Sequence, residues 1–216
     1  MRIINRNFRV FKNRGEAGRL LARELSGNDL NNPIVLGVPR GGVIVGAAIA
    51  EVLQAELDIV ISRKLRVPQQ PELAFGALAE NGSISLNESL INNLGISRQA
   101  VEHEINFQRT EIGRRQRLFR TNKPKTSLLG RSVILTDDGI ATGETFRTAL
   151  EAVKLEHPVS LTAALPVGPE STVASLAAIA DDVICWNCPP SFNAVGQFYE
   201  DFREITDAEV LSVLSP

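Results

Sequence analysis

Apolar residues recur along the chain at two spacings, which predict helices alternating with short buried strands. Residues 14–25 place apolar side chains at helical spacing, and residues 33–38 form a continuous apolar run typical of a buried strand. A glycine-rich turn at residues 39–42 leads into an apolar helix over about 43–53, and residues 57–61 predict a second strand. This strand–helix–strand order is a βαβ unit, which builds parallel sheets.

The last third of the chain repeats this order and extends the expected sheet. Apolar runs predict strands at 133–135, 159–165 and 183–186, and helical spacing predicts helices at about 142–155, 170–179 and 207–214, the last with Thr206 as its N-cap. Four or five parallel strands interleaved with helices predict an α/β fold with a doubly wound, mostly parallel sheet. Ligands of such sheets bind at the carboxyl ends of the strands.

The middle of the chain departs from this alternation. Residues 63–71 are polar, contain two prolines and lack helical spacing, so we expect a mobile loop there. Asn81-Gly82, between two short apolar runs, predicts a hairpin. Residues 97–120 predict one long helix with a thin apolar seam and a basic face. Such a face is either solvated or in contact with an anionic ligand or partner.

We expect one domain over residues 1–216, because no low-complexity linker divides the chain. Residues 62–125 would form an insertion made of the flexible loop, the hairpin and the long helix. Residues 187–216 would form a C-terminal hood or closing segment. A chain of 216 residues buries roughly 70–75% of its unfolded surface, so it needs no disulfide or metal to fold.

Composition narrows the class of protein. The 23 basic and 25 acidic residues give a net charge of −2, which argues against a bulk nucleic-acid binder. Hydrophobic residues make up 44% of the chain, which excludes a disordered protein. The chain has neither the apolar run of a signal peptide nor the ~20 apolar residues of a membrane span. We therefore expect a cytoplasmic protein that does not enter a membrane.

The only two cysteines, Cys185 and Cys188, form a C-x-x-C pair. A zinc site would need two more ligands, and both His103 and His157 are distant in sequence. A redox or metal role therefore remains the weaker interpretation, and a pair of reduced thiols near a strand end is favoured.

The strongest chemical signal follows the expected strand at 133–135. The strand runs into the carboxylates of Asp137 and Asp138, and a loop with two glycines and two threonines then opens a helix. Backbone amides of such a loop and the helix N-terminus suit a phosphate, although no P-loop pattern is present. The paired carboxylates suit the diol of a sugar or a hydrated Mg²⁺. The segment therefore predicts a site for a phosphorylated sugar.

A second anion loop follows the expected strand at 33–38. Arg40, Gly41 and Gly42 supply a charged donor and exposed amides at the start of a helix. Both loops would lie at the same edge of a parallel sheet. Together they predict one ligand with a phosphate at each end and a sugar diol in the middle.

These segments resemble the type I phosphoribosyltransferases over roughly residues 14–187. The stretch Asp137-Asp-Gly-Ile-Ala-Thr-Gly-Glu-Thr145 resembles their phosphoribosyl-pyrophosphate motif. Residues 37–42 are similar to the pyrophosphate loop, and Arg63-Lys64 resembles the start of the catalytic flexible loop. A bacterial branch with Arg-Gly-Gly in the pyrophosphate loop and Phe192-Asn-Ala-Val-Gly196 near the C-terminus is the closer match. The resemblance implies the doubly wound sheet of that family.

The resemblance also implies a reaction and roles for residues. A phosphoribosyl group would pass from phosphoribosyl pyrophosphate to a nitrogenous acceptor, usually a nucleobase, with Mg²⁺ as cofactor and pyrophosphate released. Asp137 and Asp138 would hold the ribose hydroxyls and the Mg²⁺ shell, while Lys64 and Arg63 would neutralise the leaving group as their loop closes. The implied 5′-phosphate site is Gly139, Ile140, Ala141, Thr142, Gly143, Glu144 and Thr145, and the implied pyrophosphate site is Pro39, Arg40, Gly41 and Gly42. A homodimer is a family-level expectation.

The acceptor is less defined by the sequence. The 6-oxopurine enzymes of the family carry an acidic residue where this chain has Ala141, so a hypoxanthine or guanine enzyme is disfavoured. Glu72 or Glu80 is the candidate for any proton transfer, although an ordinary surface role fits either better. The late aromatic residues either stack on a base or pack the C-terminal segment onto the sheet: Trp186, Phe192, Phe198, Tyr199 and Phe202.

Two other functions fit the same signals. The first is a sensor that binds phosphoribosyl pyrophosphate and regulates through RNA or DNA, which the basic helix at 98–125 favours and the near-neutral net charge disfavours. The second is a phosphatase or lyase acting on a sugar phosphate. We expect the transferase, because it uses both anion loops and the carboxylate pair.

Overall fold

The computed structural model describes residues 1–68, 70–120 and 124–215, apart from the side chain of Glu72. Its main sheet has six strands in the order β1-β9-β8-β7-β2-β3, and every neighbouring pair is parallel. The strands are β1 (Arg2–Asn5), β2 (Ile34–Gly37), β3 (Glu56–Ile59), β7 (Ser132–Thr136), β8 (Ser160–Val167) and β9 (Asp182–Asn187). The expected parallel sheet is confirmed, with β1 as an additional edge strand.

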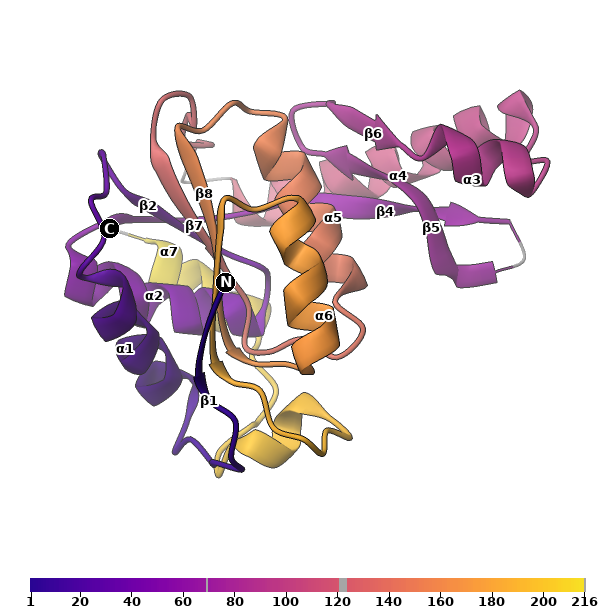
Figure 1. Cartoon of the computed structure of the whole chain (residues 1–216). Helices are drawn as coiled ribbons and strands as arrows, with labels where there is room; N and C mark the ends of the chain where they lie inside the picture. The colour runs from indigo at the N-terminus through magenta and orange to yellow at the C-terminus, as the bar shows by residue number, and fades with distance from the viewer. Residues whose placement is uncertain (69, 121–123, 216) are drawn as a thin grey trace.

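Helices cover both faces of this sheet (Figure 1). One face packs against α1 (Arg14–Leu25) and α2 (Gly41–Leu53), and the other against α5 (Glu144–Lys154), α6 (Glu170–Ser175) and the short helix η1 (Leu176–Ala178). Val35 and Ile134 belong to the first layer, whereas Leu36 and Leu135 belong to the second. Since both faces are buried, the strands are apolar throughout, which is why they stand out in the sequence.

A second, antiparallel sheet projects from one side of the main sheet (Figure 1). It contains β4 (Ser62–Val67), β5 (Gln70–Ala79) and β6 (Ile84–Leu86). With α3 (Glu88–Asn93) and α4 (Arg98–Phe119), these strands form a unit that we call the arm, residues 62–119. Its core is continuous with the main body, because Leu65 and Ile112 share a hydrophobic cluster with Ile59 of β3.

The expectation of a mobile loop at residues 63–71 is wrong for residues 63–67 and 70–71, which lie in β4 and β5, while Gln69 lies outside the described residues. Residues 62–67 are paired with β5, and Leu65 and Val67 are buried among the apolar side chains of the arm. These two residues follow the two-residue period of a strand, which the intervening charges conceal in the sequence. The long helix at 97–120 and the hairpin around Asn81-Gly82 are confirmed.

The C-terminal segment returns to the carboxyl edge of the main sheet. It contains the short helix η2 (Val195–Phe198) and ends in α7 (Asp207–Leu214), whose expected N-cap Thr206 forms a capping box with Glu209. The backbones of Phe11 and Tyr199 form an isolated parallel bridge, which ties this segment to the chain before α1.

In the part of the chain that the structure describes, no helix combines the length and hydrophobicity needed to cross a bilayer.

Candidate functional site

The two predicted anion loops adjoin. Because β2 and β7 are neighbouring parallel strands, the chain leaves both of them at the same edge of the sheet. A Cβ atom at Gly41 would lie 1.9 Å from Oδ2 of Asp138, and one at Gly42 would lie 2.8 Å from Cα of Asp137. Only glycine allows this approach, so both glycines are explained by the contact between the loops. The peptide between Pro39 and Arg40 is cis.

The two aspartates lie side by side in partly buried positions. The carboxylate of Asp137 accepts a 2.8 Å hydrogen bond from the backbone amide of Asp138 and another bond from that of Gly42. Burial and the adjacent Asp138 carboxylate raise the pKa of Asp137 well above its usual value. Burial also raises the pKa of Asp138, against the opposing effect of Arg14. The free site therefore holds costly negative charge, as expected of groups that bind hydroxyls or a cation.

Arg14 is the principal site residue that the sequence analysis missed. Its Nε lies 2.8 Å from Oδ2 of Asp138, and its side chain is only 8% exposed. Nη1 donates a 2.9 Å hydrogen bond to the carbonyl of Arg203, and the guanidinium lies 4.1 Å from the ring centroid of Phe202. Arg14 shares the buried face of α1 with Ala17 and Leu21. The sequence signal that could have identified Arg14 is the presence of a cation on the apolar face of the predicted helix.

The C-terminal segment also contacts the carboxylate loop directly. The Tyr199 hydroxyl donates a 2.6 Å hydrogen bond to the backbone carbonyl of Asp138. Burial, followed by the charge of Asp138, raises the pKa of Tyr199 well above its usual value, so this hydroxyl keeps its proton. Arg14 and Tyr199 therefore fix Asp138 from two sides.

The start of α5 presents free backbone donors at the predicted phosphate loop. Its N-cap is Gly143, with a φ of 77°, and no side chain caps the helix. Thr142 and Thr145 are exposed beside it. The first amides of a helix lack intrahelical acceptors and carry partial positive charge, so this end suits an anion.

One residue assigned to the phosphate loop by resemblance, Ile140, has its backbone amide engaged elsewhere. The amide of Ile140 donates to the carbonyl of Val167 at 3.0 Å, and the Ile140 side chain is buried in the core. The carbonyl of Ala141 accepts a 3.2 Å hydrogen bond from the Thr172 hydroxyl. Ile140 therefore supports the loop rather than offering a donor, because its amide already has an acceptor.

A cavity of about 360 Å³ lies between the two anion loops and the arm. Its wall includes four basic residues, so we call it the cationic cavity. The residues that line it are Val38, Pro39, Val60, Ser62, Arg63, Lys64, Arg66, Pro71, Arg115, Thr145 and Thr148. Arg63 and Lys64, both predicted from the sequence, line it from β4. Burial, and then the like charges of Arg115 and Arg66, lower the pKa of Arg63. This concentration of positive charge suits a polyanion.

Arg40 lies outside the wall of this cavity and forms an ion pair. Its Nη2 lies 2.5 Å from Oε1 of Glu204, with 42% of the Arg40 side chain and 77% of the Glu204 side chain exposed. Exposed pairs of this kind contribute about 0–1 kcal/mol. Arg40 is therefore available to a ligand at low cost.

Glu80 is not placed for proton transfer at the carboxylate pair. It is almost fully buried and forms an ion pair with Arg120 at 2.7 Å, and Arg120 also pairs with Asp58. This cluster joins the end of the arm to β3, so its role is structural. The side chain of Glu72 lies outside the described residues.

Cys185 and Cys188 are both buried, free thiols. Cys185 donates a 3.4 Å hydrogen bond to the carbonyl of Asn187. Among the described residues, no group of three or more His, Cys, Asp and Glu side chains forms a potential metal site. Cys185 lies in β9 and Cys188 directly follows it, so the expected position of the pair at a strand end is confirmed.

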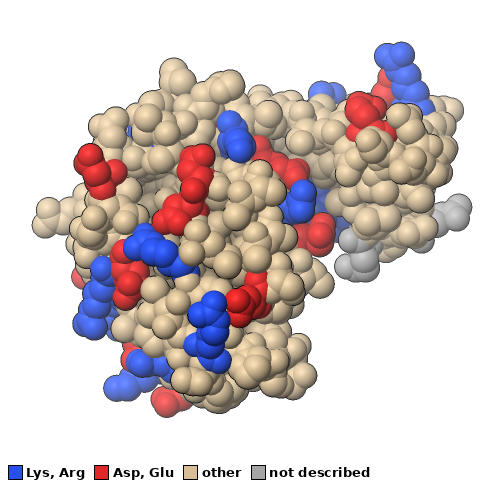
Figure 2. All heavy atoms as spheres, in the orientation of Figure 1, with Lys and Arg blue, Asp and Glu red and all other residues tan. Residues whose placement is uncertain are grey.

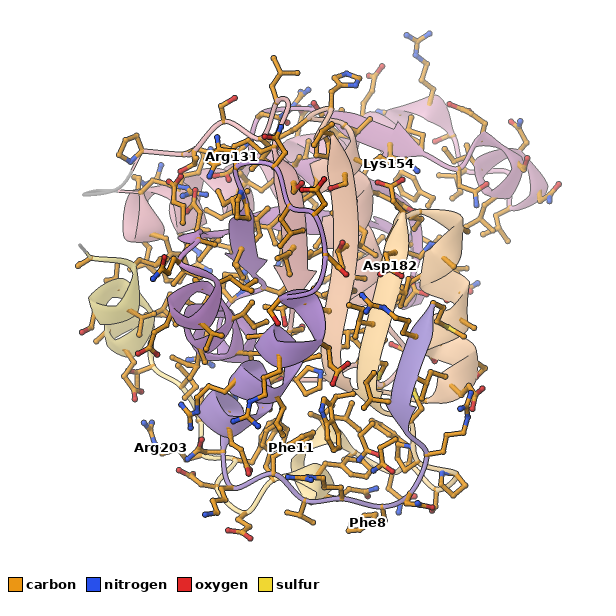
Figure 3. The ribbon with its side chains drawn as sticks, turned by 60° about the vertical axis from the view of Figure 1, so that its left-hand side comes forward. Phe8, Phe11, Arg131, Lys154, Asp182 and Arg203 are labelled. Carbon is orange, nitrogen blue, oxygen red and sulfur yellow. The ribbon has the colours of Figure 1, made fainter. Side chains whose placement is uncertain are left out.

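The late aromatic residues pack against one another and the N-terminal segment. Tyr199 stacks on Phe202 with 5.1 Å between ring centroids, and Phe198 stacks on Phe192 at 5.3 Å. Phe11 contacts Tyr199 at 5.4 Å. Figure 3 shows Phe8, Phe11 and Arg203 at one end of the molecule and Arg131 and Lys154 at the other. The packing interpretation is therefore confirmed for the buried Phe198 and Tyr199.

At the carboxyl edge of this parallel sheet lie two glycine loops, an aspartate pair and a cationic cavity. Such a combination is typical of proteins that bind phosphorylated ligands. Comparison with known proteins identifies the family. A profile of the phosphoribosyl transferase domain matches residues 10–203. The chain belongs to the phosphoribosyl transferase family, which confirms the resemblance.

Individual relatives agree with this assignment. The chain is 40% identical over 206 residues to a Mycobacterium tuberculosis protein named as a phosphoribosyl transferase, covering 95% of this chain and 46% of that relative. It thus spans about half the length of the curated relatives it matches. The crystal structure of TT1426 from Thermus thermophilus superposes with a TM-score of 0.89 at 39% identity, covering 95% of this chain and 97% of the other. The AQ2163 protein of Aquifex aeolicus, at 12% identity and a TM-score of 0.50 over 85% of this chain and 78% of the other, shares the fold.

Proposed function

We propose that this chain transfers a phosphoribosyl group from phosphoribosyl pyrophosphate to a nitrogenous acceptor and releases pyrophosphate, with Mg²⁺ as cofactor. The observation that carries the proposal is the contact between the two glycine loops at Asp137 and Asp138, with the cationic cavity beside them. The family assignment supports the same reaction class. Expectations of a homodimer and of a cytoplasmic location stay predictions.

The proposed roles follow from charge and position. The uncapped start of α5, with Thr142 and Thr145, binds the 5′-phosphate. Asp137 and Asp138 accept hydrogen bonds from the ribose hydroxyls, and Arg14 keeps Asp138 in place. Bond breaking at the anomeric carbon leaves positive charge on the sugar and negative charge on the departing diphosphate. The carboxylates suit the first charge, and the basic wall of the cavity suits the second.

The aspartate pair also fits a magnesium ion held jointly with substrate. Mg²⁺ is usually bound by one or two carboxylates together with waters and substrate phosphates. Asp137 and Asp138 supply two carboxylates, and the raised pKa values of both reflect negative charge that a cation would compensate. When bound, the ion would neutralise part of the diphosphate charge.

A nitrogenous base is the proposed acceptor, and a 6-oxopurine is the disfavoured one. The position at which 6-oxopurine enzymes of the family carry a carboxylate is Ala141, which is exposed here. Glu80, one of two acids considered for proton transfer, is committed to Arg120. The proposed reaction therefore does not use Glu80 for proton transfer.

The test is a pyrophosphate-release assay with phosphoribosyl pyrophosphate and Mg²⁺ across a panel of bases and amines. We expect release that depends on both phosphoribosyl pyrophosphate and one acceptor. The substitution Asp138→Asn should lower kcat at least about 100-fold, since electrostatic and positioning groups of this kind contribute that much. Asp201→Asn, an exposed acid of the C-terminal segment, is the control and should retain activity.

Absence of any phosphoribosyl-pyrophosphate binding by calorimetry with Mg²⁺ present would exclude the proposal. Turnover of ribose 5-phosphate without an acceptor would favour the phosphatase or lyase instead. A regulator that binds RNA or DNA has less support. On α4, the exposed Arg98 pairs with Glu102 and Arg114 with Glu111. Figure 2 shows both signs of charge interspersed over the visible face.

A further inference from the structure

We propose that Arg115 of α4 binds the diphosphate end of the ligand in the cationic cavity. The inference rests on the proposed function but extends the site to a helix outside the motifs that define the family resemblance. Arg115 would be the only basic residue in the described wall of the cavity that the arm supplies from a helix rather than from β4.

The packing of α4 on β4 explains how this helix reaches the site. Gln108, which is fully buried, accepts a 2.8 Å hydrogen bond from Nε of Arg63. The Glu104 carboxylate accepts a 3.0 Å hydrogen bond from the backbone amide of Arg66. Arg115 lies two helical turns after Gln108 and therefore on nearly the same face. The contacts that fix β4 thus also aim Arg115 at the cavity.

Within the part of the chain that the structure describes, no ion pair balances the charges around Arg115. Among the described residues, no carboxylate lies within ion-pair distance of Arg115, Lys64 or Arg66. Glu111 and Asp207 act on Arg115 only at longer range, and Arg114 and Arg40 oppose them. Bringing cations together in a half-buried wall costs free energy unless an anion joins them. The wall is therefore built for a ligand with several negative charges.

The position of the cavity selects the diphosphate end rather than the acceptor. Val38 and Pro39, which belong to the predicted pyrophosphate loop, form part of the same wall as Arg115. Thr145, at the start of α5 and in the predicted 5′-phosphate loop, also lines the cavity, so the two predicted anion loops meet in its wall. A diphosphate concentrates several negative charges in a small volume, and guanidinium groups bind phosphate oxygens with paired hydrogen bonds.

The experiment compares two adjacent arginines of α4. Arg115→Gln removes the cavity residue, whereas Arg114→Gln removes an exposed arginine that pairs with Glu111, at the same cost in net charge. Inorganic pyrophosphate with Mg²⁺ is titrated into each full-length protein by calorimetry. We expect Arg115→Gln to weaken binding about 10- to 100-fold, as for loss of a charged hydrogen-bond donor. Arg114→Gln should stay within about twofold of the unchanged protein.

Several results would overturn the inference. The first is equal pyrophosphate affinity of the two variants, and the second is no pyrophosphate binding by the unchanged protein. The third is an effect of Arg115→Gln on the KM of the acceptor alone, which would indicate that the cavity binds an anionic acceptor. Thermal unfolding checks the fold. Arg115→Lys, which keeps the charge, should bind more tightly than Arg115→Gln and replaces it in the comparison if that variant is unfolded. Failure of the proposed transfer would show instead as absent pyrophosphate release with intact pyrophosphate binding.

Discussion

At the scale of single residues, the two neighbouring aspartates of the site differ in the charged groups that surround them. Asp137 is surrounded by backbone amides and by the Asp138 carboxylate, whereas Asp138 also has a buried cation, Arg14. The cost of burying charge is therefore offset for Asp138 by Arg14 and offset less for Asp137. Residues arranged for a ligand in this way commonly lower the stability of the free protein.

This difference predicts effects of different size for two similar substitutions on stability. Asp137→Asn removes a carboxylate whose raised pKa makes the charged form unfavourable, so it should raise the free energy of unfolding at pH 7. Asp138→Asn also removes a carboxylate with a raised pKa, but it leaves the buried Arg14 without its ion-pair partner, so it should stabilise the protein less than Asp137→Asn does. Urea unfolding of both variants measures the effect. A loss of stability in Asp137→Asn at neutral pH would contradict the assignment.

The pH dependence of the first effect has a defined sign. A carboxyl whose folded pKa is raised binds its proton more tightly in the folded protein, so stability falls as pH rises from the ordinary aspartate value, about 3.9, to the raised folded value. The advantage of Asp137→Asn should therefore grow with pH across this window and then level off.

At the scale of elements, the attachment of the arm depends on a buried ion cluster. Arg120, just after α4, pairs with Asp58 and Glu80, and all three side chains are less than one-tenth exposed. Nη2 of Arg120 also donates to the carbonyl of Ile59 at 2.9 Å. The cluster fixes the C-terminal end of α4 against β3.

Removal of the central cation should therefore be costly. Arg120→Gln leaves two buried carboxylates without the cation that pairs with both, and we expect a loss of about 3–5 kcal/mol in the free energy of unfolding. The exposed Arg109→Gln, on the same helix, should change it by less than about 0.5 kcal/mol. Denaturant titration tests both. Equal midpoints for the two variants would show that the cluster contributes nothing.

The start of α7 has its own pH dependence. Hydrogen bonds from Arg203 and from the amide and hydroxyl of Thr206 lower the pKa of Glu209 to about 2 from an ordinary 4.5. Because the folded value is lowered, its contribution to stability is present above about pH 4.5 and is lost as pH falls towards 2. The stability difference between the unchanged protein and Glu209→Gln should accordingly close over that window. A constant difference from pH 6 to 2 would refute the capping role.

At the scale of the whole molecule, the sequence predicted what depends on local signals. The parallel strands, both glycine loops and the Asp137-Asp138 pair were found because each is a short pattern with its own meaning. Arg14 was missed because its partner Asp138 lies 124 positions away, and no local pattern reports that contact. The strand β4 was missed because its apolar residues are separated by charges that only the packing of α4 accounts for.

The hydrophobic cluster of the arm has a further consequence for the chain's last helix. Val210 and Leu214 of α7 belong to the same cluster as Ile112 and Phe119 of α4, and Asp207 acts electrostatically on Arg115. The position of α4, which supplies Arg115 to the wall of the cationic cavity, thus depends on the packing of α7. Displacement of α7 from this cluster should therefore weaken phosphate binding in the cationic cavity.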